Sequence, residues 1–454
     1  MYNIIKKINM NNIYNIIKNF RQNKIIICLE IFYILFFIVI FKIENKIFNT
    51  SLSIKPLKFF IKLGGSLPIK LGQLIINKNK MKYFDNNMPL WVKKLDSLLY
   101  DTIEKKKYNE EELIINYPEL KNYDNFKMIN SGSIGSIFLI EKDNKEYILK
   151  LQHKNIYEKT KKQLQIIKFI LSNKFIKKHV FIDFEDIKNT FLNQFDFVFE
   201  AKKQLEFYNI FKEKEYLIPN IYEYDNYKII MDYIPMKFIT DKNLKYHQKL
   251  KSIIKFQVFL KYMFLKEGLL HLDLHTGNWG LDENNELVIL DFGYSLRIYD
   301  KDDVEKKQVY SNLWIFMILK RKNDMLKLII KNFMINKKHY TDEELFDAFL
   351  DYSKYLNIFD SSNFYTIVYN FCNKFNILFS NELYFILYYL NFAMGISTKY
   401  LNINKNLDLL EGEDYYNSYK IVFSYEDTVF EQFPFLSCKE ENEKILNELK
   451  NNLN

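Results

Sequence analysis

The sequence predicts an α+β protein of two lobes, in which a small unit of strands and helices precedes a larger and mainly helical unit. Short apolar runs typical of strands occur in the first part at 138–140, 147–149, 221–222 and 227–231. A long helical stretch lies among them, from about residue 157 to residue 213. From about residue 242 onward the pattern is mostly helical and is interrupted by one hairpin at 287–290. Because no Gly-, Ser- or Pro-rich linker separates the two parts, we expect lobes of one body.

The composition is that of a folded protein with a large core. The chain has 454 residues, of which 48% are hydrophobic, and a net charge of +9. This is enough material for two or three structural units and excludes intrinsic disorder as the main state. Lysines are spread along the chain among Asp and Glu, which favours an ordinary solvated surface over a nucleic-acid partner. The three cysteines lie far apart without zinc spacing, which indicates a reducing compartment.

The N-terminal region is basic and then apolar. Residues 1–24 form a basic leader without acidic residues, and residues 25–41 are apolar except for Glu30. As a helix, residues 25–41 would span about 26 Å, slightly less than a hydrocarbon core. We predict a single N-terminal transmembrane helix; a buried amphipathic helix or a cleaved leader is the alternative. The protein would then be associated with a mitochondrial or other organellar membrane.

The rest of the chain divides by its pattern into four segments. They are a helical extension at 42–123, a lobe of strands with a helical insertion at 124–234, a helical lobe at 235–437 and a polar tail at 438–454.

A candidate phosphate-binding loop lies between two expected strands. It is built from small residues: Ser131, Gly132, Ser133 and Gly135. Small residues in such a turn let backbone N–H groups approach phosphates closely, and Lys150 on the next strand would reach the phosphates as a point charge. Gly and Ser also make ordinary hairpin turns, so this loop alone is weak evidence of phosphate binding. The segments that follow it provide the stronger evidence.

Two later segments complete a phosphate-handling set. Asp273 and Asn278 have the five-residue spacing of a kinase catalytic loop, in which the Asp positions or deprotonates the nucleophile and the Asn holds magnesium. Asp291 begins Asp-Phe-Gly after an apolar strand, where a carboxylate would bridge magnesium to the phosphates. The three segments in this order predict a two-lobed protein-kinase-like fold that binds ATP and Mg²⁺.

Two histidines in the catalytic segment have a simpler interpretation than metal binding. His271 and His275 are four residues apart, which on a helix would suggest a metal pair. The flanking glycine and strand place them on a loop instead. We therefore interpret His271 as a structural histidine that holds the loop by hydrogen bonds.

Three segments of the chain together resemble one known family. Lys70, Gly72 and Gln73 form a Lys-x-Gly-Gln sequence, residues 131–137 read Ser-Gly-Ser-Ile-Gly-Ser-Ile, and residues 271–278 read His-Leu-Asp-Leu-His-Thr-Gly-Asn. They resemble the KxGQ signature, the A-A-S-I-G-Q-V loop and the H-x-D-x-H-P-G-N loop of the UbiB family. These are atypical kinase-like proteins associated with coenzyme Q and other prenyl-lipid metabolism.

The resemblance implies roles for particular residues. Lys150 would bind phosphates and pair with Glu200, Asp273 would be the catalytic aspartate, and Asn278 and Asp291 the metal ligands. Met231, at the end of an expected strand, is placed among the nucleotide contacts.

The same resemblance gives the upstream signature a gating role. Lys70, Gly72 and Gln73 would lie on an N-terminal helical extension folded over the nucleotide cleft, where they limit access by a protein substrate.

The chain departs from the family at three positions. The acid pair E-x-D falls at 194–196, where Gln194 cannot form an ion pair with Lys70, so only Asp196 remains. Gly132 stands where the family has Ala, which makes the loop more like that of protein kinases. Lys78 stands where an Arg is expected, and Lys lacks the bidentate fork of Arg.

We predict an ATP-dependent phosphotransferase or ATPase that acts in, or supports, prenyl-quinone metabolism such as ubiquinone biosynthesis, or lipid metabolism. Its partners would be a small-molecule or lipid substrate or membrane-bound biosynthetic enzymes. A protein kinase is one alternative, but the short segment after Gly293 lacks a peptide platform. A nucleotide-binding pseudokinase scaffold is the other, although every catalytic position is filled.

The few glycines support the proposed site. Eight of the 11 glycines cluster in three short regions: Gly64, Gly65 and Gly72; Gly132 and Gly135; and Gly277, Gly280 and Gly293. Backbone that turns tightly or approaches a phosphate closely explains this clustering.

Overall fold

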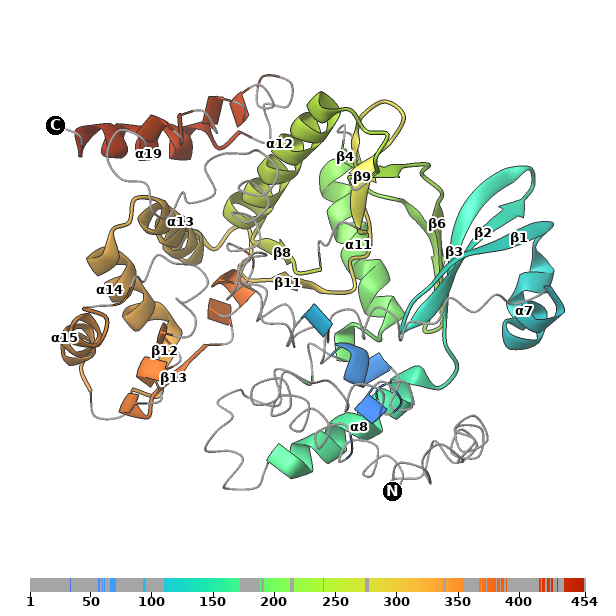
Figure 1. Ribbon diagram of the computed structural model, residues 1–454, viewed down its shortest axis with the longest axis horizontal. Coiled ribbons are helices and arrows are strands. Elements are labelled where there is room, and N and C mark those ends of the chain that lie inside the picture. The colour runs from blue at the N-terminus through green and yellow to red at the C-terminus, as the bar shows by residue number, and fades with distance from the viewer. Residues whose placement is uncertain are drawn as a thin grey trace. The chain divides into compact units, whose positions relative to one another are not determined.

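The computed structural model describes the chain chiefly between residues 110 and 354 and near the C-terminus (Figure 1). The described residues are 33, 56–57, 59, 61, 66–70, 93–94, 110–171, 188, 192–212, 216–239, 241–273, 277–337, 340–354, 356, parts of 367–431, and 437–452. The predicted leader at 1–24, and the predicted span at 25–41 apart from Tyr33, lie outside them. Within the described part of the chain, no helix is both long enough and apolar enough to span a bilayer.

The chain divides into two compact units. Unit 1 comprises Met1–Ala201 and Ile221–Tyr233, and unit 2 comprises Lys202–Asn220 and Ile234–Asn454. Helix α11 (Phe197–Phe211) begins in the first and ends in the second.

A five-stranded antiparallel sheet forms the centre of unit 1 (Figure 1). In sheet order its strands are β1 (Asn125–Ser131), β2 (Gly135–Lys142), β3 (Lys145–Gln152), β6 (Lys228–Asp232) and β5 (Ile221–Tyr224). The runs expected to be strands in this region lie in β2, β3, β5 and β6, except that Tyr227 precedes β6. Asp143 and Asn144 turn the chain between β2 and β3 with φ of 54° and 58°, the backbone of a type I′ hairpin that suits the twist of the strands.

One side of this sheet is covered by the segment that precedes it. Helix α7 (Glu110–Asn116) and the 3₁₀ helix η2 (Pro118–Asn122) bury Leu113, Tyr117 and Leu120. These side chains form one apolar cluster with strand residues Phe138, Ile140, Leu149 and Leu151. Burial of these side chains holds strands β2 and β3 against the preceding segment, because each side chain contributes about 1.5–3 kcal/mol.

The helical stretch expected from about 157 to 213 contains separate helices. The structure has α8 (Ile156–Leu171) and, after a turn at Gln194 and Phe195, the separate helix α11. Asp196 is the N-cap of α11, because its Oδ1 accepts a hydrogen bond of 3.0 Å from Phe199 N. The sequence pattern remains helical across this point, but the capping carboxylate starts a new helix.

Unit 2 is built around the buried helix α12 (Tyr246–Tyr262), which continues as a π-helical turn, η3 (Met263–Glu267). Gly268 ends this turn in the left-handed conformation, with φ of 64°. A Cβ at Gly268 would lie 2.4 Å from Tyr299 O, so the position requires glycine for both its conformation and its space.

Unit 2 contains more short strands than the one hairpin expected from the sequence. One sheet has the order β4 (Tyr216–Leu217), β10 (Leu287–Ile289), β9 (Trp279–Leu281) and β7 (Lys237–Phe238). Two antiparallel pairs are β8 (Leu269–His271) with β11 (Ser295–Arg297), and β12 (Met334–Ile335) with β13 (Leu378–Phe379). Strands of two or three residues are too short to show a period of two, so the pattern alone does not reveal them.

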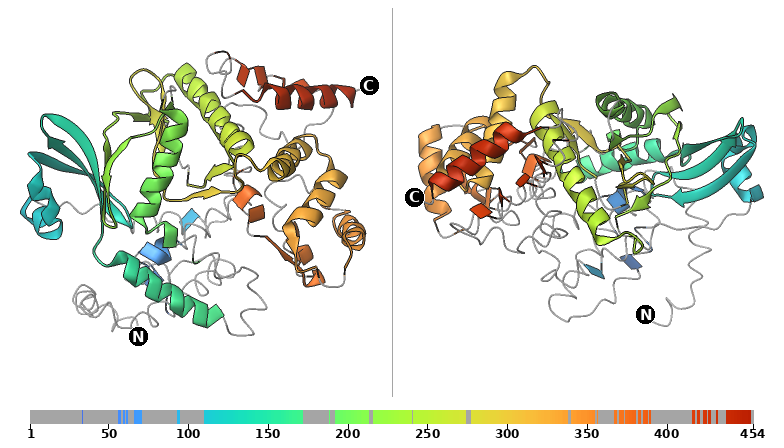
Figure 2. Two further views of the ribbon diagram at one scale, coloured as in Figure 1. Left: turned by 180° about the vertical axis from the view of Figure 1, so that it is seen from behind. Right: turned by 90° about the horizontal axis from the view of Figure 1, so that it is seen from above.

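Helices make up much of the remaining described part of unit 2 (Figure 2). They include α13 (Val304–Ile318), α14 (Lys322–Phe333), α15 (Asp342–Tyr352) and α19 (Lys439–Asn451). The segment expected to be a polar tail forms α19, whose Ile445 and Leu449 are buried in one cluster with Ile315 and Ile318 of α13. This helix is amphipathic, so its few apolar residues face the core although its overall composition is polar.

Candidate active site

A lysine and a glutamate of unit 1 form a sheltered ion pair. Central strand β3 carries Lys150 between Ile137 of β2 and Ile229 of β6, and the first turn of α11 carries Glu200. Lys150 Nζ lies 2.5 Å from Glu200 Oε1, and the side chains are 15% and 3% exposed. Lys150 Nζ also lies 5.3 Å from the ring centroid of the buried Phe197. Because a buried pair is screened little by salt, this contact fixes the lysine ammonium group in place.

The start of α11 is attached to β3 by a second contact. Gln152 Nε2, at the end of β3, donates a hydrogen bond of 2.8 Å to Phe195 O. Asp196 then caps the helix, and Glu200 N donates to Asp196 O at 2.9 Å. The residues at 194–196 therefore place Glu200 opposite Lys150, and Asp196 acts here as a helix cap.

The candidate phosphate loop is a tight hairpin between β1 and β2. Gly132 N donates to Gly135 O at 2.8 Å, which closes the turn. A Cβ at Gly135 would lie 2.4 Å from Leu151 O of β3, so no larger residue fits there without a backbone shift. A Cβ at Gly132 would make only an ordinary contact of 3.6 Å with Gly135 O.

A chain of side-chain hydrogen bonds connects this loop to the segment before the sheet. Ser131 Oγ lies 3.0 Å from Ser136 Oγ, which lies 2.9 Å from the hydroxyl of Tyr117. The Tyr117 hydroxyl lies 2.9 Å from His153 Nδ1, and His153 Nε2 lies 3.0 Å from Gly132 O. Burial lowers the pKa of His153, although its hydrogen bond to the Gly132 carbonyl opposes this effect. The neutral Nε2–H tautomer satisfies both contacts.

Two further hydrogen bonds hold the loop backbone. His153 N donates to Ile134 O at 2.9 Å, and Ser66 Oγ donates to Ser133 O. Ser66 is 6% exposed and lies in the N-terminal extension. This extension therefore contacts the loop directly.

The remaining predicted residues of unit 1 are only partly described. Lys70 lies at the end of the helical run 66–70 and is half-buried, whereas Gly72 and Gln73 lie outside the described residues. Met231 is buried in β6, where it pairs with Ile148 of β3.

His271 of unit 2 has the structural role expected of it. It is 2% exposed; its Nε2 lies 3.1 Å from Leu290 O, and its Nδ1 accepts a hydrogen bond of 3.3 Å from Asp273 N. Its ring packs against Phe292, with ring centroids 5.1 Å apart, and against Phe207, at 6.2 Å. A neutral imidazole with its proton on Nε2 serves both polar contacts. His271 thereby joins the backbone of the catalytic segment to the backbone just before Asp291. His275 lies outside the described residues.

The two predicted metal ligands lie at the same end of neighbouring strands. Leu290 N donates to Asn278 O at 2.8 Å, which places Asn278 beside the residue before Asp291. Asn278 Nδ2 donates to Asp273 O at 2.7 Å, so the amide oxygen is the atom that suits a metal. Asp291 has φ of 62°, a left-handed conformation that is unusual for aspartate. Strain of this kind concentrates at functional sites.

The donor set suits magnesium. Mg²⁺ prefers hard oxygen ligands and takes one or two carboxylates from a protein together with phosphate oxygens. An amide oxygen of Asn278 and a carboxylate of Asp291 match this preference. These residues would hold the ion, and the ion would supply charge to neutralise phosphate oxygens.

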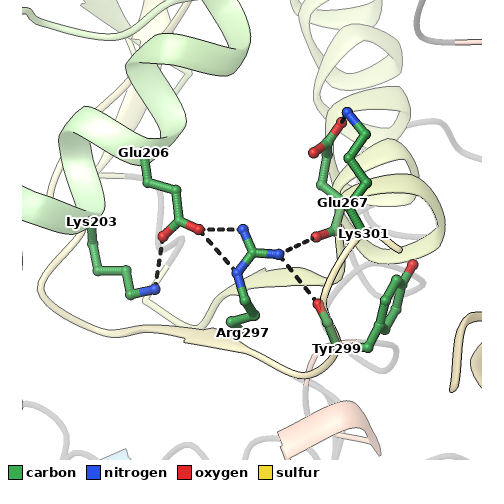
Figure 3. A network of polar contacts seen from close by, with 6 residues as sticks. All are labelled: Lys203, Glu206, Glu267, Arg297, Tyr299 and Lys301. Carbon is green, nitrogen blue, oxygen red and sulfur yellow. Dashed lines mark hydrogen bonds and ion pairs between the residues drawn. The ribbon is translucent and has the colours of Figure 1, made fainter. Parts of the chain in front are cut away.

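Arg297, in strand β11 shortly after Asp291, makes several polar contacts with neighbouring segments (Figure 3). Arg297 Nε donates to Glu206 Oε1 at 3.0 Å, and Arg297 Nη1 donates to Glu267 O at 2.9 Å and to Tyr299 O at 3.2 Å. Burial raises the pKa of Glu206, but the hydrogen bonds from Lys203 and Arg297 outweigh it and hold that pKa below its ordinary value. Arg297 thus joins α11, the end of η3 and β11 within unit 2.

One comparison with known proteins identifies the class of domain. Residues 104–329, just under half of the chain, match the family model of the ABC1 atypical kinase-like domain. The chain therefore contains an atypical kinase-like domain. This is the domain of the UbiB family, so the predicted kinase-like class is confirmed. The prenyl-lipid assignment within that family stays a prediction.

Two weaker similarities add little to this assignment. A protein of Paramecium bursaria Chlorella virus 1, whose name assigns it provisionally to the ABC transporters, is 26% identical over 192 residues. The match covers 40% of this chain and 41% of that protein, so the chain matches about two fifths of the relative's length. The solved complex of Rv3197 with erythromycin from Mycobacterium tuberculosis is 17% identical, with a TM-score of 0.37 over 52% of this chain and 61% of that one. A likeness of that degree supports no functional comparison.

Three of the residues described above do not follow from the sequence motifs. Tyr117 and His153 hold the loop from outside it, and their partners are distant in the chain, so no local pattern reveals them. The sequence does single out Arg297 in one way, because it is one of only three arginines among 65 basic residues. A position that keeps arginine in such a sequence suggests a need for its planar, multidentate group.

Proposed function

We propose that the protein binds Mg-ATP and acts as an atypical kinase or ATPase. The observation that carries this proposal is the sheltered ion pair between Lys150 and Glu200, on the strand next to a glycine-containing hairpin, within an ABC1 atypical kinase-like domain. Phosphoryl transfer depends mainly on positioning and on charge stabilisation, so a fixed ammonium group is what the reaction needs.

Each unit contributes distinct chemistry to this proposal. Lys150 and the loop 131–135 of unit 1 would bind the phosphates. In unit 2, Asp273 would position or deprotonate the attacking hydroxyl or water, and Asn278 and Asp291 would hold magnesium. The contact of Asp273 N with the buried His271 and of Asp273 O with Asn278 Nδ2 fixes the backbone that carries this carboxylate. A fixed position is what general-base catalysis requires.

The acceptor is proposed to be a small molecule or a lipid, or water in the case of an ATPase. Helix α13 begins at Val304, soon after Gly293, and the intervening residues are all described. A protein kinase uses a long segment at this place to hold a peptide. The connection in this protein is too short for that purpose, which favours a substrate other than a protein.

A role in prenyl-quinone or lipid metabolism at a membrane is the finer part of the proposal. Its support is the resemblance of residues 70–73, the phosphate loop and residues 271–278 to the UbiB family. The apolar segment 25–41 supports attachment to a membrane by its composition.

Turnover of ATP by the full chain in detergent, with and without a prenyl-quinone, tests the enzymatic part. We expect hydrolysis or transfer in the wild type that the lipid changes, and a loss of about 100-fold or more in Asp273→Asn. Equal turnover in Asp273→Asn would contradict the role of Asp273. Binding of ATP without any turnover in either condition would favour the pseudokinase scaffold.

A further inference from the structure

Three consecutive carbonyl groups of the phosphate loop are held from outside the loop. Gly132 O accepts from His153 Nε2 at 3.0 Å, Ile134 O accepts from His153 N at 2.9 Å, and Ser133 O accepts from Ser66 Oγ. In such loops, water usually donates the hydrogen bonds to the carbonyl groups, because Gly-rich turns lie at the surface. Here, protein donors fix all three.

The direction of these carbonyls determines where the loop amides point. In a trans peptide the C=O of one residue and the N–H of the next lie in one plane and point in opposite directions. The N–H groups of Ser133 and Ile134 therefore face away from the donors that hold Gly132 O and Ser133 O. Successive N–H groups on one side of a turn form an anion-binding concavity.

His153 owes its own orientation to a chain of hydroxyl groups. Its Nδ1 accepts from the hydroxyl of Tyr117, and that hydroxyl contacts Ser136 Oγ, which in turn contacts Ser131 Oγ. Ser136 is fully buried, and the Tyr117 ring packs edge-on against Phe138 with ring centroids 5.2 Å apart. These neighbours leave the Tyr117 hydroxyl little freedom to move. The chain of bonds begins at Ser131 on one side of the loop and ends at Gly132.

We propose that Tyr117 and His153 are positioning residues that preorganise the loop amides for the phosphates of a nucleotide. The inference rests on the proposed function, because it assigns the loop to polyphosphate binding. Neither residue needs to touch the ligand. They act on Gly132 O, so that the amide of Ser133 in the same peptide unit is already turned away from His153 when the phosphates arrive. Ser66 holds Ser133 O, and with it the amide of Ile134, in the same way.

The test compares a ligand that has phosphates with one that lacks them. The full chain is titrated with ATP and, separately, with adenosine, in the presence of Mg²⁺. Tyr117→Phe removes one hydroxyl and keeps the ring against Phe138. We expect its Kd for ATP to rise about tenfold, because the hydrogen bond that orients His153 is lost, with its Kd for adenosine unchanged.

A second variant and a matched control distinguish this effect from a general loss of folded structure. His153→Ala should raise the Kd for ATP at least as much as Tyr117→Phe, because it removes the donor to Gly132 O itself. Restoring a side-chain amide donor in His153→Gln should recover part of the affinity. Tyr227→Phe is the control: Tyr227 lies in the same unit and is 64% exposed, so neither Kd should change.

The outcomes separate the inference from the proposed function. If the wild type binds ATP but Tyr117→Phe and His153→Ala leave its affinity unchanged, the inference is wrong and the proposed function stands. The inference is also wrong if both variants weaken ATP and adenosine by the same factor, since that is a structural effect. If the wild type binds neither ligand, the proposed function fails and the inference fails with it.

Discussion

The candidate residues of the two units are held in place by different physical means. In unit 1, Lys150 is fixed by an ion pair with Glu200, and the phosphate loop by a chain of side-chain hydrogen bonds. In unit 2, Asn278 and Asp291 are fixed by backbone pairing of short strands and by rings packed around His271. The positions of the candidate residues in unit 1 therefore depend on a few polar atoms. In unit 2 they depend on many packing and backbone contacts, each of which contributes a small part. Single polar deletions should act most strongly in unit 1.

The largest effect is expected at the ion pair of unit 1. Lys150→Met leaves the buried Glu200 carboxylate without its ammonium partner, which should cost about 3–5 kcal/mol of the free energy of unfolding. The double variant Lys150→Met, Glu200→Leu should recover most of this loss, because an apolar pair of similar volume is often as stable as a buried ion pair. Urea unfolding of the full chain measures both. A single variant as stable as the wild type would show that the pair contributes no stability.

The arginine network is one place where unit 2 also depends on polar atoms. Arg297→Lys keeps the charge but loses the planar group that serves Glu206, Glu267 O and Tyr299 O together, so we expect a loss of about 2–3 kcal/mol. Arg321→Lys is the matched control, because Arg321 is 41% exposed and its ion pairs are at the surface. The control should change stability by about 0.5 kcal/mol or less. Equal losses of stability in the two variants would contradict the structural role assigned to Arg297.

Two glycines of the phosphate loop should differ in the same experiment. Gly135→Ala brings a Cβ to 2.4 Å from the backbone oxygen of Leu151, which should cost about 1–3 kcal/mol in unfolding free energy. Gly132→Ala meets only an ordinary contact at 3.6 Å, so we expect a change of about 0.5 kcal/mol or less. The difference between the two urea midpoints is the measurement. A destabilised Gly132→Ala would mean that the loop is more crowded than its contacts indicate.

The smallest expected effect is the pH dependence that His153 contributes. Burial lowers its pKa below the ordinary value of 6.5. As the pH falls below 6.5, His153 takes up a proton in the unfolded chain before it does so in the folded chain. The contribution of His153 to the free energy of unfolding is therefore complete above pH 6.5 and is lost as the pH falls through the pKa of His153 in the folded chain. The difference in urea midpoint between the wild type and His153→Gln should therefore be smaller at pH 5 than at pH 8. A difference that does not change with pH would place His153 in a solvated environment.

The sequence predicted the parts of the fold that have local patterns. The strands at 138–140, 147–149 and 227–231 alternate or form apolar runs, and the structure places them in β2, β3 and β6. The short strands β8, β9 and β11 were missed because three residues carry no period. The break at Asp196 was missed because the helical pattern continues across a capping residue.

The candidate site was predictable to the extent that it consists of motifs. Lys150, Asp273 and Asp291 lie in recognisable segments, and the pairing of Lys150 with Glu200 followed from a family resemblance across fifty residues of chain. No motif marks Tyr117 or His153, because hydrogen bonds between distant segments depend on the tertiary structure. Arg297 was noticeable only because arginine is rare in this chain.

Binding of ATP by the double variant of the ion pair tests the central claim most directly. The full chain is titrated with ATP in the presence of Mg²⁺ and again with EDTA, both for the wild type and for Lys150→Met, Glu200→Leu. We predict that the wild type binds ATP, more tightly with Mg²⁺, and that the folded double variant loses at least about tenfold in affinity, because the fixed ammonium group is gone. A wild type that does not bind ATP, or a double variant that binds it equally well, would contradict the account.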